Sequence, residues 1–276
     1  MTYCNKWNIE VKSDKTKVVV FRNGWRSVKE HFYYNGKESA IVNSYVYLGM
    51  LLNSNGKCLH TQKRLAQQGG KTMSSLINSL KQLYVTKEQQ MYLFDSMVGS
   101  VLGYASEIWG FHRARDIDFM HNLFCRYVLK LGKNVPLPFL YGELGHFPLH
   151  VYRHHNILKY WYHIWSVKPP IVYEIYKLLL TDANNGKNKW ASNVKDLLCN
   201  LGFNDLWISQ DPGNFSLEVI KLRIKDQYLQ LWFSRLEECN KLDIYKKIKL
   251  EFCIEKYLHF HINVQHLTKI VVEHLN

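Results

Sequence analysis

The chain has 276 residues and carries 36 Lys and Arg against 23 Asp and Glu, which gives a net charge of +13. This excess favours a polyanionic partner, nucleic acid ahead of an acidic membrane, over an ordinary basic protein. The six cysteines form no Cys-x-x-Cys pair, which argues against a zinc finger, and no apolar run is long enough for a membrane span or a secretory signal. We therefore expect an intracellular protein, nuclear or cytoplasmic and not secreted, with free thiols and no membrane partner.

The first 56 residues show a mixed α/β pattern. A short extended segment at 7–11 precedes a β-branched strand at 17–21. Two further strands flank Asn35-Gly36, a strong hairpin signal because both positions tolerate positive φ. Residues 45–52 read as one more strand, in which Gly49 predicts a bulge or the close approach of another backbone.

After Gly56 the apolar residues recur at helical spacing. Helices are expected over 59–83, 87–102, 118–131, 149–165, 172–180, 190–201, 217–236 and 242–252, with a mixed segment at 257–275. Pro136 and Pro138 predict a loop, and the polar segment 182–188 is the best candidate linker. The sequence therefore predicts an α+β chain that is mostly helical, in three parts: 1–56, 57–181 and 189–276.

The basic residues are concentrated where acids are missing. No Asp or Glu occurs from Ser39 to Lys87, although a solvated helix face normally mixes both signs. The cations of this span are Lys57, Lys63, Arg64, Lys71, Lys81 and Lys87. We predict that they contact a nucleic-acid backbone, where neutralised phosphates release counterions. A second acid-free span covers 144–173, but its aromatic side chains are expected to pack rather than to stack on bases.

Three patterns suggest sites but are better explained by structure. Gly70-Lys71-Thr72 resembles the end of a phosphate loop, yet the segment reads helical and lacks the first glycine, so Gly69-Gly70 is interpreted as a helix kink. Asp116 and Asp118 diverge on a helix and are interpreted as N-terminal caps. The pairs His154-His155 and His259-x-His261 lack further ligands at metal spacing. No metal or cofactor is predicted to bind this chain.

Several motifs occur in a fixed order along the chain. They are Asp14–Phe21, Phe32–Gly36, Tyr45–Gly49, Leu102–Gly110 (LGYASEIWG), Tyr141–Leu149 (YGELGHFPL), Ile157–Trp161, Asn240–Lys246 and Glu255–Leu258. This order resembles the non-LTR retrotransposon reverse transcriptases, in the part that follows their Tyr-x-Asp-Asp catalytic turn. The resemblance extends over nearly the whole chain.

The resemblance implies a role for each part. Residues 1–56 would be a palm remnant with motif D and the primer-grip hairpin, 57–181 a helical thumb with the helices that follow it, and 189–276 a C-terminal helical region. Lys15 and Lys17 would lie near the phosphates of the incoming nucleotide, where an ammonium can neutralise the leaving pyrophosphate. Tyr47, Leu48 and Gly49 would form the primer grip. The set Lys57, Lys63, Arg64, Lys71 and Lys81 would follow the template–primer backbone.

One departure from the family decides what activity to expect. Polymerisation by these enzymes needs two metal ions held by carboxylates, and this sequence contains no Asp-Asp pair. By the resemblance, fingers, most of the palm, any endonuclease domain and a terminal zinc knuckle are also expected to be absent from this sequence. We expect no polymerisation by this chain alone, Mg²⁺ only in an intact polymerase, and RNA or RNA–DNA duplex together with the missing N-terminal polymerase part as partners. Two alternatives remain: a helical protein-interaction module and a decayed reading frame without activity.

Overall fold

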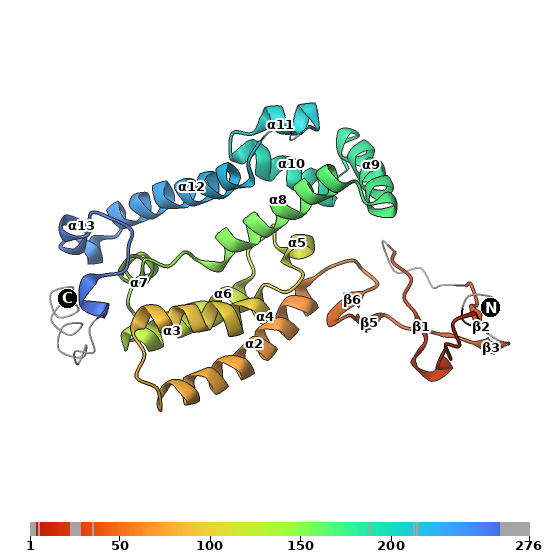
Figure 1. The fold of residues 1–276 in the computed structure, drawn as a ribbon, viewed down its shortest axis with the longest axis horizontal. Coiled ribbons are helices and arrows are strands. Elements are labelled where there is room, and N and C mark those ends of the chain that lie inside the picture. Colours follow the sequence, from red (N-terminus) through yellow and green to blue (C-terminus); the bar gives the residue numbers. More distant parts are fainter. Residues whose placement is uncertain are drawn as a thin grey trace. The chain divides into compact units, whose positions relative to one another are not determined.

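The computed structural model describes residues 4, 6–22, 29–34, 36–187, 189–211, 213 and 215–259. They form two compact units, Met1–Arg64 and Leu65–Asn276, which we call the N-terminal unit and the helical unit. Among the described residues, all of the short strands lie before residue 54, and the rest is mainly helical (Figure 1). The mostly helical α+β class predicted from the sequence is therefore confirmed.

The strands of the N-terminal unit occur in three separate pairs. Strand β1 (Lys17–Val18) runs parallel to β4 (Ala40–Ile41). Strand β2 (Tyr33–Tyr34) is antiparallel to β3 (Lys37–Glu38), as the Asn35-Gly36 signal predicts, although Asn35 itself lies outside the described residues. Strand β5 (Ser44–Tyr47) is antiparallel to β6 (Met50–Asn53). A single turn of 3₁₀ helix, η1 (Ser13–Lys15), precedes β1.

The interpretation of residues 45–52 as one strand is wrong. Leu48 and Gly49 have φ of 46° and 83°, so the chain reverses there and pairs Tyr47 with Met50. Positive φ at both central residues is the geometry of a two-residue hairpin turn whose twist matches that of the strands. Leucine is rare in this conformation, because its side chain crowds the backbone. Gly49 therefore marks a turn, not a bulge.

Helices build almost all of the helical unit. Helix α2 (Leu59–Leu80) begins in the N-terminal unit and continues into the helical unit. The helices that follow are α3 (Lys87–Leu93), α4 (Ser100–Leu102), α5 (Ser106–Trp109), α6 (Arg115–Leu129), α7 (Leu137–Leu144), α8 (Leu149–Val167), α9 (Pro170–Asn184), α10 (Trp190–Asn200), α11 (Asn204–Ser209), α12 (Leu217–Glu237) and α13 (Tyr245–Ile248). A π-helical turn, η2 (Phe94–Gly99), joins α3 to α4, and 3₁₀ turns η3 (Asn240–Leu242) and η4 (Lys256–His259) flank α13.

The helix termini follow local chemistry. Thr86 caps α3 through a reciprocal pair of hydrogen bonds with Gln89, which confirms the start predicted there. The loop predicted around Pro136 and Pro138 is wrong in part, because Pro138 lies in the first turn of α7, where a missing N–H costs no helical hydrogen bond. The helix predicted over 242–252 is also wrong in length, since only α13 and the short η3 form there.

Aromatic and aliphatic side chains from distant segments form the core of the helical unit. Helices α8 and α12 lie side by side, and α5 packs against α8 (Figure 1). The fully buried large side chains include Phe94, Phe124, Phe139, Ile157, Trp161 and Trp232. The predicted linker 182–188 is wrong in part, because α9 extends to Asn184, and α9 packs against α10.

Glycine allows close contact at two places in this core. Helix α2 continues unbroken through Gly69-Gly70, and a Cβ on Gly69 would lie 2.4 Å from Cδ2 of Leu102. Gly69 therefore allows α2 to pack tightly on α4. Gly145, with φ of 55°, ends α7, and a Cβ on it would lie 2.3 Å from the backbone nitrogen of Ile254.

The segment that meets Gly145 fastens the C-terminal region to α7. Leu144 and Ile254 form an antiparallel bridge, and Glu255 N–H donates to the carbonyl of Glu143 at 3.0 Å. The Tyr257 hydroxyl donates to the buried Glu143 carboxylate, whose pKa is raised by burial. The YGELGH motif is therefore a structural joint in this chain, since its glycine and glutamate both contact residues more than a hundred positions later.

Candidate nucleic-acid interface

The part of helix α2 in the helical unit has one buried and one solvated side. Leu65, Ala66, Met73, Leu76 and Leu80 are buried. The exposed positions between them are all polar: Gln67, Gln68, Lys71, Ser74, Ser75, Asn78 and Ser79. Lys81 and Gln82 continue this exposed surface after the helix ends. Hydroxyls, amides and ammonium groups without a carboxylate are the groups that bind phosphates and sugars of a nucleic-acid backbone.

The basic residues predicted to bind the backbone fall into two groups. Lys57, Lys63, Lys71 and Lys81 are exposed, and none of them pairs with an acid in the described part of the chain. The Lys81 ammonium donates only to Asn78 Oδ1, at 3.3 Å. Arg64 is half-buried, and its Nε is buried with no hydrogen-bond partner among the described residues. Arg64 is therefore a weaker candidate than the four lysines.

The predicted motif D and primer grip are linked within the N-terminal unit. The Tyr45 hydroxyl donates to the carbonyl of Lys15 at 3.1 Å, which joins η1 to the β5–β6 hairpin. Thr61 is fully buried, and its hydroxyl donates to the carbonyl of Leu51 at 2.6 Å, which joins β6 to the first turn of α2. Sequence analysis missed both contacts, because a tyrosine and a threonine at these positions carry no distinctive motif.

The tip of the hairpin is accessible. Tyr47 and Leu48 are 59% and 73% exposed, and Gly49 beside them is exposed too. Lys15 and Lys17 are also exposed. A flat tip formed by an aromatic ring, an aliphatic side chain and a glycine can contact a sugar or a base closely, because glycine adds no side chain at the contact.

Several side chains of the second acid-free span pack into the core, as predicted for its aromatic residues. Trp161 is fully buried, and its indole N–H donates to the Tyr176 hydroxyl at 3.0 Å. Arg153 is 2% exposed and forms an ion pair with Asp118 at 3.0 Å. Asp116 and Asp118 lie in the first turn of α6, at the helix N-terminus predicted for them, but the predicted side-chain cap does not form, since the cap position is Ala114. Asp118 instead neutralises a buried guanidinium.

His146 of this span is buried beside His121 of α6, and His150 and His154 are half-buried. His146 contacts Asp95 at 2.9 Å and His121 at 3.1 Å through its two ring nitrogens. Burial lowers the pKa of His121 well below its usual value, and it lowers the pKa of His150 to about 3 and of His154 to about 4. Neutral imidazoles can pack in a core but cannot attract phosphates, so these residues do not extend the interface.

No group of three or more His, Cys, Asp and Glu side chains in the described residues is arranged to hold a metal ion. Of the predicted histidine pairs, His154-His155 has no third ligand within that part, and His261 lies outside it.

The comparisons with known proteins identify no relative. No family model matches the chain, and no curated protein or solved structure matches it. None of the helices that the structure describes combines the length and apolar character needed to cross a membrane.

Proposed function

We propose that the chain is the C-terminal part of a non-LTR retrotransposon reverse transcriptase and binds template–primer duplex without sequence preference. In this proposal the β5–β6 hairpin contacts the primer strand through Tyr47, Leu48 and Gly49. The acid-free surface of α2 belongs to the thumb and follows the duplex backbone. Lys15 and Lys17 neutralise the phosphates of the incoming nucleotide only when the remainder of the polymerase supplies the metal site.

The observation that carries the proposal is that hydrogen bonds connect motif D, the β5–β6 hairpin and the first turn of α2. The hydrogen bonds from Tyr45 to Lys15 and from Thr61 to Leu51 join motif D, the hairpin and the first turn of α2 within the N-terminal unit. The exposed hairpin tip and the unpaired lysines that follow along the chain are features a duplex-binding surface needs. Neither a protein-interaction module nor a decayed reading frame requires a helix of this length to lack acidic residues.

Binding of a fluorescent RNA–DNA hybrid by the full chain tests the proposal. If about three phosphates are neutralised, affinity should fall about 40-fold between about 50 and 200 mM salt. Charge reversal of the exposed residues Lys63, Lys71 and Lys81 to Glu should reduce both the affinity and the salt dependence. Lys247→Glu, at an exposed residue of α13, is the matched control for each of the three single reversals. Salt-independent binding, or equal losses in the control, would contradict the proposal.

A primer-extension assay tests the expectation that the chain alone does not polymerise DNA. Two-metal phosphoryl transfer requires carboxylates that hold both ions, and the chain has no Asp-Asp pair. The purified chain should therefore extend no primer with Mg²⁺, and addition of a polypeptide carrying the N-terminal polymerase part should restore synthesis. Mg²⁺-dependent synthesis by the chain alone would show that it holds a complete catalytic site.

The alternative of a protein-interaction module is favoured by one observation. Ile171, Ile175 and Leu178 form an apolar stripe on α9 at helical spacing, and all three are at least half exposed. If the α2 charge reversals leave hybrid binding unchanged while Ile175→Glu abolishes a protein contact, this alternative replaces the first proposal. The third interpretation, a decayed reading frame, predicts poor solubility, because strands without neighbours expose their edges. Soluble, cooperative unfolding would count against it.

A further inference from the structure

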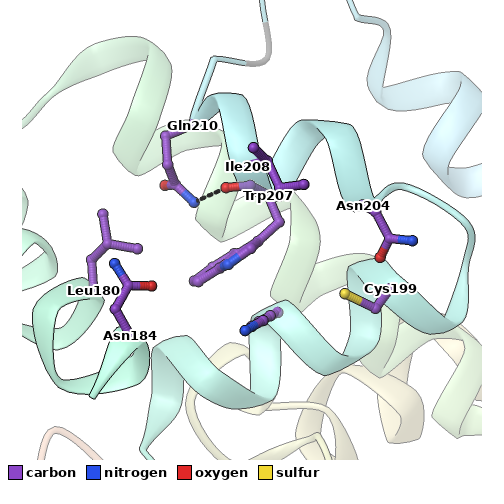
Figure 2. A pocket seen from close by; sticks show the side chains of 8 residues that line it. Leu180, Asn184, Cys199, Asn204, Trp207, Ile208 and Gln210 are labelled. Carbon is purple, nitrogen blue, oxygen red and sulfur yellow. Dashed lines mark hydrogen bonds between the residues drawn. The ribbon is translucent and has the colours of Figure 1, made fainter. Parts of the chain in front are cut away.

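The C-terminal half of the helical unit contains a pocket of about 450 Å³, away from the surface of α2. Its walls come from α9, α10 and α11 (Figure 2). The lining residues are Leu180, Asn184, Lys195, Cys199, Asn204, Trp207, Ile208 and Gln210. This volume is in the range of about 300–1,000 Å³ typical of small-molecule sites.

The lining is rich in hydrogen-bond donors and has no carboxylate. The side chains of Asn184, Asn204 and Lys195 and the indole N–H of Trp207 have no hydrogen-bond partner among the described residues. The nearby acid Asp182 is not in the lining and is bound by the ammonium groups of Lys187 and Lys189. Lys195 therefore gives the pocket a positive charge that no acid in its wall offsets, which favours an anion.

One wall of the pocket is held in place by a chain of hydrogen bonds. Gln210 ends α11 with φ of 50°, and its Nε2 donates to the carbonyl of Trp207 at 2.5 Å. The Oε1 of Gln210 accepts from the Tyr176 hydroxyl at 2.5 Å and from Trp165 Nε1 at 3.3 Å. Because both ends of this amide are occupied, Gln210 positions the wall and leaves ligand binding to its neighbours.

The remaining side chains are arranged around the Trp207 ring. Figure 2 shows Leu180 and Asn184 on one side of this ring and Cys199 with Asn204 on the other. Leu180 and Asn184 are four residues apart on α9, and Lys195 and Cys199 are four apart on α10, so each helix presents one pair to the pocket. Amide groups recognise the edges of nucleobases, apolar side chains contact their faces, and an ammonium binds phosphate.

We propose that this pocket binds one nucleotide unit, with the Asn184 and Asn204 amides on its base and sugar and the Lys195 ammonium on its phosphate. The choice of RNA as the source of this unit rests on the proposed function. A free nucleotide would offer the same chemistry. The pocket would thus give the chain a contact to a single strand in addition to the duplex contact of α2.

The test measures binding of uridine 5′-monophosphate, and of a labelled uridine decanucleotide, to the full chain. Lys195→Glu should weaken both by about tenfold or more, because it removes a charge-assisted hydrogen bond and adds repulsion. Cys199→Phe should abolish binding by filling the pocket, and Asn184→Leu should weaken it at nearly unchanged volume. Lys247→Glu changes the net charge equally outside the pocket and should stay within twofold of the parent chain. Thermal unfolding of each variant establishes that it is folded.

The outcomes separate this inference from the proposed function. Loss of mononucleotide binding in Cys199→Phe together with unchanged hybrid binding supports the pocket as a second site. Loss of decanucleotide binding as well identifies a strand as the source, whereas loss of mononucleotide binding alone identifies a free nucleotide. If the parent chain binds no mononucleotide, or if folded Lys195→Glu and Cys199→Phe bind like the parent, the inference fails. A chain that binds mononucleotide but no hybrid would refute the proposed function and leave the pocket intact.

Discussion

The two units differ in how they bury their side chains. Among the described residues of the N-terminal unit only Met50 and Thr61 are buried, while Phe21, Tyr33, Tyr47 and Leu48 remain exposed by more than half. The helical unit instead surrounds several tryptophans and phenylalanines completely. Its helices satisfy their own backbone hydrogen bonds, whereas isolated strand pairs leave one edge of each strand open.

This difference shows which unit can be stable without a partner. A two-stranded hairpin is at best marginally stable in water unless it packs on further strands or a helix. The bond from Thr61 to Leu51 supplies one such attachment for the β5–β6 hairpin. The other two strand pairs have no comparable buried anchor among the described residues. The helical unit should therefore determine the unfolding transition of the chain.

The largest contrast should come from matched phenylalanine substitutions. Phe124 is fully buried and stacks on Phe94 at a centroid distance of 4.6 Å, so Phe124→Ala should cost about 3–5 kcal/mol of unfolding free energy. Phe21 is 57% exposed, and Phe21→Ala should change it by less than about 0.5 kcal/mol. Denaturant unfolding measures both. Similar losses for the two variants would mean that the units share one core.

Acid should destabilise the helical unit through its half-buried histidines, His150 and His154. Burial lowers the pKa of His150 to about 3 and of His154 to about 4, with repulsion from Arg153 as a further cause in each case. The folded state keeps these rings neutral, whereas the unfolded state binds protons below about pH 6.5. Stability present above that pH is therefore lost as the pH falls, by about 1.4 kcal/mol per pH unit for each histidine.

Denaturant unfolding between pH 7 and pH 5 measures this effect. The double variant His150→Phe/His154→Phe removes the two titrating groups and should flatten the profile even if its own stability differs. An equally steep profile in that variant would assign the acid sensitivity to other groups.

Adjacent glycines of α2 offer a sharper test of packing. A Cβ on Gly69 would overlap Leu102, so Gly69→Ala should cost about 1–3 kcal/mol. A Cβ on Gly70 would meet Met120 Sδ at 3.5 Å, an ordinary contact, so Gly70→Ala should stabilise the helix by up to about 1 kcal/mol. Thermal unfolding should thus shift in opposite directions. Stabilisation by both variants would indicate that α2 does not pack closely on α4.

The smallest effect should be confined to the hairpin turn. Leu48 has φ of 46°, a conformation that asparagine adopts more readily, so Leu48→Asn should stabilise the turn by about 1 kcal/mol. Gly49→Ala should have the opposite effect, because Gly49 has φ of 83°. Amide exchange of residues 44–53 measures both. Exchange in the helical unit should not change in either variant.

Long amphipathic helices could be predicted from the sequence, because their burial repeats with the helical period. The start of α3, the extent of α10 and the long α8 and α12 agree with that pattern. Turns and short helices could not be predicted in this way. The Leu48-Gly49 turn lacks the Asn-Gly signal, and α11, only six residues long, is too short for periodicity to appear.

The two candidate sites also differ in how far they could be predicted from the sequence. The acid-free surface of α2 could be predicted, since charge composition along one helix is visible in the sequence. The lysines of α2 are exposed, whereas the half-buried position of Arg64 depends on tertiary packing. The pocket residues come from three helices spread from Leu180 to Gln210, and no single segment contains a motif. Their proximity arises only when α9, α10 and α11 assemble.

The joint between α7 and residues 253–257 has a consequence for synthesis of the protein. Gly145 meets the backbone of Ile254, and Glu143 meets Tyr257, across a long stretch of intervening chain. During translation, the carboxylate of Glu143 and the end of α7 stay uncovered until residues 253–257 have been synthesised. Helices α7 and α8 therefore remain open to chaperones, or to mispairing with other nascent chains, until nearly all of the helical unit has left the ribosome.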